Sequence, residues 1–351
     1  MSINKNYSKN ISRNLAMTPN KIKSLYNFTF DDLAQHLQST FYARLVFQSI
    51  YQQKVECVSQ ITMKNKKSLI ANYPLDLPEV KSVITSEDKH TRKYILQLHD
   101  KKLIESVWMD YDERCTVCVS TQVGCAMGCV FCATGQMGFN RHLTTGEIIA
   151  QIMLLEKLEK NKVRNVVFMG MGEPLHNFAS TMNAIDILTD FRAFAIARRH
   201  ITLSTVGLVP QIQRLIDEPQ SVNLAVSLHG ATNKARNSLV PIGKKWPLEE
   251  LMDVCREYTK RKKKRIFFEW TVIANENDSI DDAHDLAKLL EGIRAHINLI
   301  PLNTTKGYSG IPGAEVRIKQ FREILNNYNI PNTIRQKKGI DVAAGCGQLK
   351  T

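Results

Sequence analysis

The sequence predicts an α/β fold with parallel strands, preceded by a small helical region and a β-hairpin. From residue 111 onward, apolar runs rich in β-branched residues alternate with helical stretches. Repeated strand-then-helix units join parallel strands, so we expect a barrel-like or doubly wound sheet. The candidate strands are residues 116–120, 165–169, 200–205, 223–228, 265–273 and 296–302.

A helix between the first two strands has a recognisable beginning. Thr144 and Glu147 have the spacing of a capping box, in which each side chain accepts a hydrogen bond from the other residue's backbone N–H. Ile148, Ile152 and Leu155 then make one apolar face. We therefore expect a helix over residues 147–160 that packs on the sheet.

The N-terminal region reads differently. Its apolar spacing predicts helices over residues 30–38, 42–52 and 66–72. Two apolar runs then flank the polar turn Asp100-Lys101-Lys102, a pattern typical of a β-hairpin. We therefore divide the chain into a basic helical accessory domain (1–75), a hairpin extension that joins it to the core (76–110) and the core itself (111–351).

Composition restricts the class of protein. With 351 residues, 43% of them hydrophobic, the chain is long enough for one large α/β domain and an appendage. The N-terminus lacks an apolar signal region, and no run approaches the roughly 18 apolar residues of a membrane span, so we expect a cytoplasmic protein. Five of the eight cysteines fall in one short stretch, which in a reducing compartment indicates metal or redox chemistry rather than a disulfide framework.

The charge is strongly and unevenly basic. The net charge is +13, and the first 70 residues carry ten Lys or Arg against three Asp or Glu. A second basic run occupies residues 260–265, at the end of a predicted helix. Such asymmetry favours a polyanionic partner, of which nucleic acid is the commonest. The alternative is a solvated basic surface.

Three of the clustered cysteines form a distinctive triplet. Cys125, Cys129 and Cys132 have the spacing C-x3-C-x2-C, which offers three thiolates to one metal centre and leaves a fourth position open. Structural zinc sites and ferredoxin-type clusters usually take four protein ligands, so the open position indicates chemistry at the metal. A zinc site completed by a distant histidine, or reduced thiols packed in a core, are the alternatives.

Polar or glycine-rich residues follow four of the predicted strands. They are Gly170-Met-Gly-Glu-Pro174, Ser204, Ser227-Leu228-His229 and Asn303. In barrels the chemistry gathers at these strand ends. Each group alone could be a turn, a helix cap or a structural histidine, but behind a cysteine triplet they indicate a ligand site. Glycine permits close backbone approach, Glu173 offers a carboxylate to an amino group, and Ser204 and Asn303 offer polar contacts to ribose or carboxylate.

Two further cysteines stand apart from the triplet. Cys118 lies on the strand that leads into the triplet loop, and Cys346 lies between Gly345 and Gly347. A thiol flanked by glycines is sterically accessible, which suits a nucleophile better than a packing residue.

The triplet, with Phe131 before its third cysteine, resembles the radical S-adenosylmethionine superfamily. The whole order of motifs is similar to that of the radical methyl synthases that act on carbon 2 of adenine in 23S ribosomal RNA and transfer RNA. These motifs are Cys118-Val-Ser-Thr-Gln-Val-Gly-Cys125, the triplet with Ala133-Thr-Gly135, Gly170-Met-Gly-Glu-Pro174, Ser227-Leu-His229 and Cys346-Gly-Gln-Leu349. The similarity runs from the hairpin to the C-terminus and more loosely into the helical region, and Gly345 departs from the Ala of some relatives.

This resemblance implies a partial (βα)6 TIM-type barrel and a role for each matching residue. Cys125, Cys129 and Cys132 would ligate one 4Fe-4S cluster. S-adenosylmethionine would be surrounded by Gly172, Glu173, Ser204, Ser227, Leu228, His229 and Asn303. Cys346 would carry the methyl group, Cys118 would resolve the intermediate through a transient disulfide, and Glu105 would accept a proton. Cys57, Cys115 and Cys255 match no role and are read as incidental thiols.

The implied reaction consumes two molecules of S-adenosylmethionine per turnover. The first methylates the thiolate of Cys346, and cleavage of the second yields a radical that takes hydrogen from the S-methyl group, so that the carbon adds to adenine. The implied substrates are the adenine of the peptidyl transferase centre and an adenine beside the tRNA anticodon, which must leave its stack to be reached. An external donor such as a flavodoxin or ferredoxin would supply electrons to a monomeric enzyme.

Two other functions remain possible from the sequence. Methylation of carbon 8 of the same ribosomal adenine, which confers antibiotic resistance, would use the same two cysteines. The motifs Val123-Gly-Cys-Ala126 and Ala133-Thr-Gly-Gln-Met-Gly-Phe139 are more similar to the carbon-2 branch. A non-catalytic iron–sulfur RNA-binding protein would leave Cys118 and Cys346 without a role.

Overall fold

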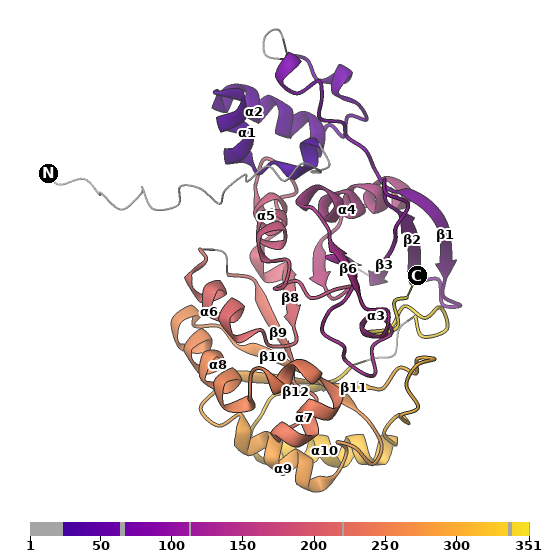
Figure 1. Cartoon of the computed structure of the whole chain (residues 1–351), viewed down its shortest axis with the longest axis vertical. Helices are drawn as coiled ribbons and strands as arrows, with labels where there is room; N and C mark the ends of the chain where they lie inside the picture. Colours follow the sequence, from indigo (N-terminus) through magenta and orange to yellow (C-terminus); the bar gives the residue numbers. More distant parts are fainter. Residues whose placement is uncertain (1–23, 64–66, 112–113, 220, 336–338, 351) are drawn as a thin grey trace, which may run out of the picture.

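A computed structural model describes residues 24–63, 67–111, 114–219, 221–335 and 339–350 (Figure 1). In this part of the chain, one ten-stranded sheet has the order β1-β2-β3-β4-β7-β8-β9-β10-β11-β12. Its strands from β4 onward are parallel, and the pairing runs from each to the next along the chain. No described pairing joins β12 back to β4, so the parallel array is an open, partial barrel.

The six predicted strands are confirmed as six consecutive members of this array. They are β4 (Arg114–Cys118), β7 (Asn165–Phe168), β8 (Ile201–Thr205), β9 (Asn223–Ser227), β10 (Ile266–Val272) and β11 (Ala295–Pro301). Each overlaps its predicted range because an apolar run of four to seven residues, buried on both faces, is typical of a parallel strand. The short β12 (Asn332–Ile334) was not predicted, since three residues carry no readable alternation.

Helices cover the outside of the array, as Figure 1 shows for the segments between successive strands. They are α4 (Thr145–Glu159), α5 (Phe178–Thr189), α6 (Val209–Asp217), α8 (Leu248–Lys262), α9 (Ile280–Leu289) and α10 (Glu315–Asn327), with the short α3 (Ala133–Gln136) and α7 (Asn233–Leu239). The predicted capping box is present at the start of α4, where Thr144 caps the helix and pairs with Glu147. Between strands and helices lies one continuous apolar core that includes Phe168, Leu203 and Phe268.

The predicted hairpin is present, but it belongs to a larger unit. Strands β2 (Thr91–Gln97) and β3 (Leu103–Tyr111) pair in antiparallel fashion, and an unpredicted strand β1 (Glu79–Thr85) adds to their outer edge. β1 has no buried residue, which explains why it left no hydrophobic signal. β3 also pairs with β4, so the hairpin is a direct extension of the barrel sheet.

The N-terminal region is helical, as expected. It contains α1 (Phe30–Leu37) and α2 (Thr40–Phe47), continued by a π-helical turn (Gln48–Gln52). The helix predicted over 66–72 is a single 3-10 turn (Lys67–Leu69), with residue 66 outside the described part. This region packs on the barrel helices: the Arg192 guanidinium lies 3.1 Å from the ring centroid of Phe30, and Gly146 N–H donates to Asn27 Oδ1 at 2.7 Å.

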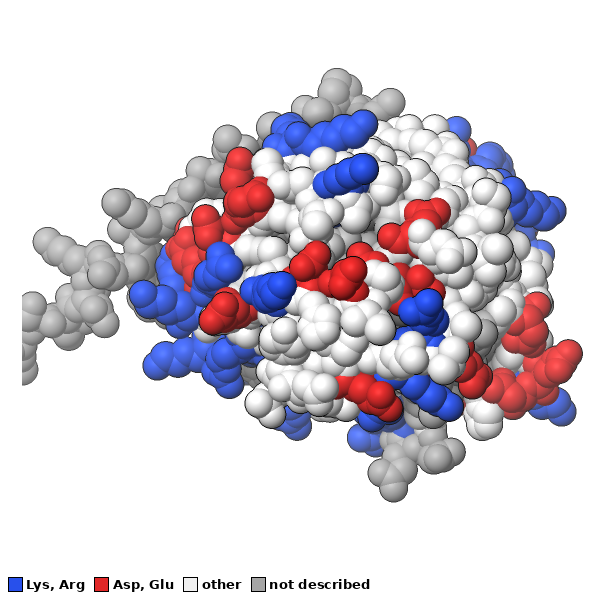
Figure 2. All heavy atoms as spheres, turned by 90° about the horizontal axis from the view of Figure 1, so that it is seen from below, with Lys and Arg blue, Asp and Glu red and all other residues white. Residues whose placement is uncertain are grey.

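The structure describes only part of the two basic regions predicted from the sequence. Of the ten N-terminal Lys and Arg, those at positions 5, 9, 13, 21, 23, 64 and 66 lie outside the described residues. In the second basic run, Arg261 pairs with Asp217 at 2.8 Å, while Lys262 and Lys264 donate to backbone carbonyls. Acidic and basic side chains are interspersed on the face seen in Figure 2. The second run is therefore tied into local structure.

Gln151 links α4 to the hairpin and the barrel, so its loss should destabilise the fold. Its side chain is buried and bonds with Ser106 and with both backbone groups of Ser120. Replacing Gln151 by Leu leaves these buried polar groups without their hydrogen-bond partner. We therefore expect a loss of about 3 kcal/mol in the free energy of unfolding. Urea denaturation measures this loss. The matched control Leu158→Gln, at an exposed position of the same helix, should change stability by less than about 0.5 kcal/mol; equal losses would contradict the assignment.

Candidate active site

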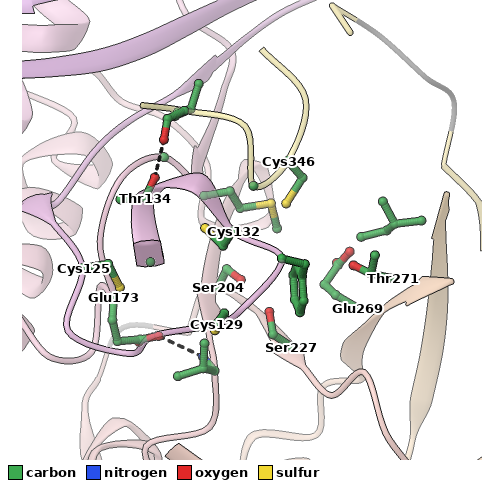
Figure 3. Close-up of a pocket in the computed structure, with 18 of the residues that line it drawn as sticks. Cys125, Cys129, Cys132, Thr134, Glu173, Ser204, Ser227, Glu269, Thr271 and Cys346 are labelled. Atoms are coloured by element: carbon green, nitrogen blue, oxygen red, sulfur yellow. Dashed lines mark hydrogen bonds between the residues drawn. The ribbon is translucent and has the colours of Figure 1, made fainter. Parts of the chain in front are cut away.

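A cavity opens at the carboxyl ends of the parallel strands, and most of the predicted site residues line it (Figure 3). From the sequence-predicted set, its wall contains Cys125, Cys129, Cys132, Gly172, Glu173, Ser204, Ser227, His229, Asn303 and Cys346. These residues come from six separate segments of the chain. Leu228, Cys118 and Glu105 are not part of this wall.

The triplet loop leaves the short strand β5 (Gln122–Gly124) and returns through β6 (Phe139–His142). Gly124 and Gly128 have φ of 73° and 66°, a left-handed conformation that glycine adopts without strain and that turns the loop back on itself. Cys132 caps α3, whose Gly135 approaches the loop so closely that a Cβ there would lie 2.9 Å from the carbonyl oxygen of Cys129. The loop therefore holds three thiols on one side of the cavity.

These thiols fit an iron–sulfur cluster. They lie close enough to interact electrostatically, and burial raises the pKa of Cys125 to about 12 and holds that of Cys129 well above its usual value. Among the described residues, no three His, Cys, Asp or Glu side chains converge as a single metal ion requires. A four-iron cluster places each cysteine on its own iron and does not need that convergence. Burial disfavours the thiolate form, and binding of a metal to these thiols would release their protons.

Glu173 is held rigidly at the cavity wall. Its carboxylate accepts hydrogen bonds from the backbone N–H groups of Leu175, at 3.0 Å, and Val206, at 2.8 Å. Burial nevertheless raises the pKa of Glu173 to about 7. Gly172, with φ of 102°, passes so close to Gln122 that a Cβ would lie 2.5 Å from the Gln122 Cβ. Gln122 Oε1 accepts the Glu173 N–H at 2.8 Å, so the glycine allows the contact that orients Glu173.

The opposite wall comes from the ends of β8, β9 and β10. Ser204 and Ser227 face the cavity in Figure 3. His229 has φ of 57° and is buried, and its Nδ1 accepts a hydrogen bond from Thr271 N–H at 2.9 Å, which leaves the proton on Nε2. Burial lowers the pKa of His229 to about 3, so the ring is neutral. Leu228 is buried behind this wall.

A second cavity adjoins the first and brings the two outlying cysteines together. Cys118 and Cys346 both line it, although the chain separates them widely. The two cavities share Cys346 and five further wall residues: Met169, Ile300, Asn303, Arg335 and Leu349. All eight cysteines are free thiols in the structure. Burial raises the pKa of Cys118 to about 12, while the positive charge of Arg335 acts against this rise. Cys346 is exposed, and Arg335 favours its thiolate as well.

Glu105 lies on β3, two residues before Val107, which lines the second cavity. It is fully buried, whereas a hairpin glutamate is usually solvated. Its Oε2 lies 3.6 Å from Lys93 Nζ and accepts the Lys350 N–H at 3.2 Å, while Oε1 has no partner among the described residues. Burial raises the pKa of Glu105, which favours uptake of a proton.

Comparisons with known proteins agree on one family. The family model of the radical SAM superfamily matches residues 119–290. The chain is 55% identical over 268 residues to the dual-specificity RNA methyltransferase RlmN 1 of Myxococcus xanthus, covering 76% of this chain and 75% of the relative. It is 40% identical over 336 residues to a probable dual-specificity RNA methyltransferase RlmN of Clostridium novyi, covering 94% and 98%. The chain belongs to the RlmN family.

A solved structure supports this assignment at the level of the fold. A radical SAM methyltransferase from Sphaerobacter thermophilus superposes with a TM-score of 0.88 at 39% identity, covering 93% of this chain and 99% of that one. The predicted partial TIM-type barrel is thereby confirmed. Radical SAM membership implies a 4Fe-4S cluster and S-adenosylmethionine as cofactors. The helices in the described part of this RlmN-family chain include none long and apolar enough to cross a membrane.

Sequence reasoning missed two charged residues of the site. Glu269 and Arg335 line the first cavity, with Arg335 Nη1 lying 3.4 Å from Glu269 Oε2. A glutamate inside the apolar strand β10 was a usable signal, because a charge in a buried strand needs a functional or paired environment. Arg335 follows the short β12, where no local pattern marks it.

His229 should make stability depend on pH in a predictable direction. Because its pKa falls from about 6.5 in the unfolded chain to about 3, its contribution is present above pH 6.5 and is lost as pH falls. Between pH 6.5 and 5 this loss amounts to about 2 kcal/mol in the free energy of unfolding. In His229→Asn, which keeps an acceptor for Thr271 and tolerates the positive φ, that part of the dependence should disappear. Urea titrations of the apoprotein at both pH values measure this difference in the free energy of unfolding. The control His90→Asn, at an exposed position, should show the same pH dependence as the wild type. An unaltered pH dependence in His229→Asn would contradict the prediction.

Proposed function

We propose that this protein methylates carbon 2 of adenine in 23S rRNA, at the peptidyl transferase centre, and in tRNA, beside the anticodon, through a methylated Cys346. The observation that carries the proposal is the pairing of cavities: Cys346 lines both the cavity of the triplet and the cavity of Cys118. A methyl carrier has to meet the methyl donor on one side and the resolving thiol on the other. Relatives named dual-specificity RNA methyltransferases support the substrate class.

The first cavity would hold the cofactors. Cys125, Cys129 and Cys132 hold one 4Fe-4S cluster, which when bound supplies the electron for reductive cleavage of S-adenosylmethionine. Around S-adenosylmethionine lie Gly172, Glu173, Ser204, Ser227, His229 and Asn303, with Leu228 supporting them from behind. Glu173 orients an amino group, and the neutral His229 offers its Nε2 proton without adding charge. The apolar walls exclude water from the reacting groups.

Cys346 would be the methyl carrier. Its Sγ takes a methyl group from one S-adenosylmethionine, so that the sulfonium–methyl bond breaks as the new S–C bond forms and the thiol proton leaves. Arg335 favours the thiolate that this step requires. A second S-adenosylmethionine would be cleaved to methionine and a 5′-deoxyadenosyl fragment, and this fragment would take up the hydrogen atom that leaves the S-methyl group. The carbon would then bond to carbon 2 of adenine, and one electron would pass back from the adduct to the cluster as the ring proton is lost. The RNA is at that point covalently attached to Cys346.

Cys118 and Glu105 would complete the reaction. Glu105, whose Oε1 is unpartnered, accepts the ring proton from carbon 2. The Cys118 thiolate would attack the sulfur of Cys346, so that the S–S bond of a transient disulfide forms as the carbon–sulfur bond breaks. The electron pair stays with the released carbon, and the proton that Glu105 had accepted completes the methyl group. Two thiols in one cavity are placed for this exchange. An external donor such as a flavodoxin or ferredoxin reduces the disulfide and the cluster.

The remaining regions would serve the substrate. We assign residues 1–75 to RNA binding, 76–110 to the hairpin extension and 111–351 to catalysis. The charge excess of the first 70 residues supports this division, since Lys and Arg contacts to phosphate supply sequence-independent affinity. The protein would act as a monomer in the cytoplasm.

Replacing any one of the triplet cysteines by Ala should abolish the cluster. After anaerobic reconstitution, the wild type should hold about four irons per chain and absorb near 400 nm, and each variant should lose the iron together with cleavage of S-adenosylmethionine. Iron analysis and the visible spectrum measure this. Cys57→Ala, which removes an exposed thiol outside the site, should keep the wild-type iron content. Stoichiometric zinc at the triplet with no iron would overturn the cofactor assignment.

Replacing Cys346 and replacing Cys118 should stop the reaction at two different steps. With Cys346→Ala, no methylated cysteine and no RNA adduct should form, because the carrier is missing. With Cys118→Ala, a covalent protein–RNA species should accumulate at Cys346, because the thiol that breaks the adduct is missing. Mass spectrometry of the protein and of digested 23S rRNA and tRNA measures both outcomes.

The matched control for Cys118 is Cys115→Ala, which removes a thiol from the same strand and should still turn over. Normal turnover by Cys118→Ala, or methylation by Cys346→Ala, would refute the two-cysteine mechanism. Methyl groups found only at carbon 8 would show that the protein is a carbon-8 methyltransferase. Unmodified RNA after incubation with the active, reconstituted enzyme would contradict the proposed RNA substrates.

A further inference from the structure

Arg236, on α7, is buried without an acidic partner. It is 1% exposed. Its Nη1 donates to the carbonyls of Ser227, at 2.7 Å, and Leu228, at 2.6 Å, and its Nη2 donates to the carbonyl of Val206. Nε has no hydrogen-bond partner, and no ion pair with an Asp or Glu includes Arg236 among the described residues.

The fold makes room for this guanidinium. A Cβ at Gly207 would lie 3.3 Å from Arg236 Nη2, and one at Gly243 would lie 3.5 Å from Nε. A Cβ at Gly230 would lie 2.5 Å from the backbone nitrogen of Arg236. Three glycines from separate turns thus surround one arginine. A side chain at Gly230 would clash with the Arg236 backbone, while the turns of Gly207 and Gly243 pack closely against the guanidinium.

A buried cation of this kind needs a negative charge nearby. Removing an ion from water costs several kcal/mol even after the protein relaxes, and neutral carbonyls recover only part of that cost. Ser227 and Val206, to which the guanidinium is bonded, line the first cavity, as does Cys129. Cys129 and Cys255 are the groups whose negative charge would oppose the effect of burial, which lowers the pKa of Arg236 to about 10. Cys129 is the one that faces the cavity.

We propose that Arg236 is a built-in counter-charge for the cluster held by Cys129 and its two neighbours. It acts as a positioning residue: it holds the carbonyl ends of β8 and β9 that frame the cofactor cavity, and its charge favours the reduced cluster. Reduction adds one electron, and therefore one negative charge, to a site of low dielectric, where a fixed cation acts strongly. The inference rests on the proposed cluster and adds the residue that tunes it.

Three variants of the reconstituted holoenzyme test this. Arg236→Met removes the charge with a side chain of similar length, Arg236→Lys keeps the charge, and the control Lys234→Met removes an exposed charge from the same helix. An anaerobic dithionite titration followed by electron paramagnetic resonance gives the cluster midpoint potential, and iron analysis gives its occupancy. In Arg236→Met the ratio of reduced to oxidised cluster at a fixed potential should fall at least tenfold, a negative shift of about 59 mV for a one-electron couple. Arg236→Lys should stay within threefold of the wild type, and Lys234→Met should match it.

A second route keeps the test decisive if Arg236→Met does not fold. Cys255→Asp introduces a carboxylate beside the guanidinium and neutralises it while Arg236 stays in place, so the same negative shift should appear. A wild-type midpoint potential in a cluster-loaded Arg236→Met or Cys255→Asp protein would refute the proposal that Arg236 is a counter-charge. Arg236 would then have only a structural role. Absence of iron from the wild type itself would instead refute the proposed function, so the two failures are distinguishable.

Discussion

The site depends on how the last residues of the chain are held across the barrel mouth. Gly347 accepts a hydrogen bond from Ala133 N–H at 2.7 Å, and Leu349 accepts one from the Thr134 hydroxyl at 2.7 Å. Asn303 Nδ2 donates to the carbonyl of Cys346 at 3.1 Å. The C-terminal segment is thereby fastened to the triplet helix and to the end of β11. Without these contacts Cys346 would lie on a loose chain end, where its distance from the other thiols would be undefined.

The same C-terminal segment contacts the hairpin, so the hairpin lies next to the site as well as extending the sheet. Lys350 N–H bonds to Glu105 on β3, and β3 pairs with β4, whose last residue is Cys118. Cys118 and Glu105 therefore lie on neighbouring strands of one sheet, close behind the segment that carries Cys346. A hairpin that is continuous with the barrel can hold the Glu105 carboxylate in register with Cys118, which a flexible connection between domains could not do.

Charge is unevenly balanced around the cavities. Arg236 is buried without a carboxylate partner. Burial raises the pKa of Glu173 to about 7 and lowers that of His229 to about 3, which keeps the imidazole neutral. Burying Arg236 without a carboxylate and ionising the buried Glu173 both cost free energy, whereas His229 is neutral near pH 7 without such a cost. Perturbed ionisable groups of this kind concentrate at functional sites. Arg335 adds to the pattern by sharing its charge between the two cavities.

By itself, the sequence determined the features that depend on neighbouring residues. The triplet spacing, the capping box of Thr144 and Glu147, and six apolar runs with polar residues behind them were readable because each is a local pattern. Only the tertiary structure decided which distant residues meet. It placed Cys118 and Cys346 in one cavity, buried Glu105 beside Lys93 and enclosed Arg236 between strand ends. Strands β1 and β12 also escaped prediction, since an exposed edge strand and a three-residue strand are stabilised by pairing with neighbours, which leaves no signature in their own residues.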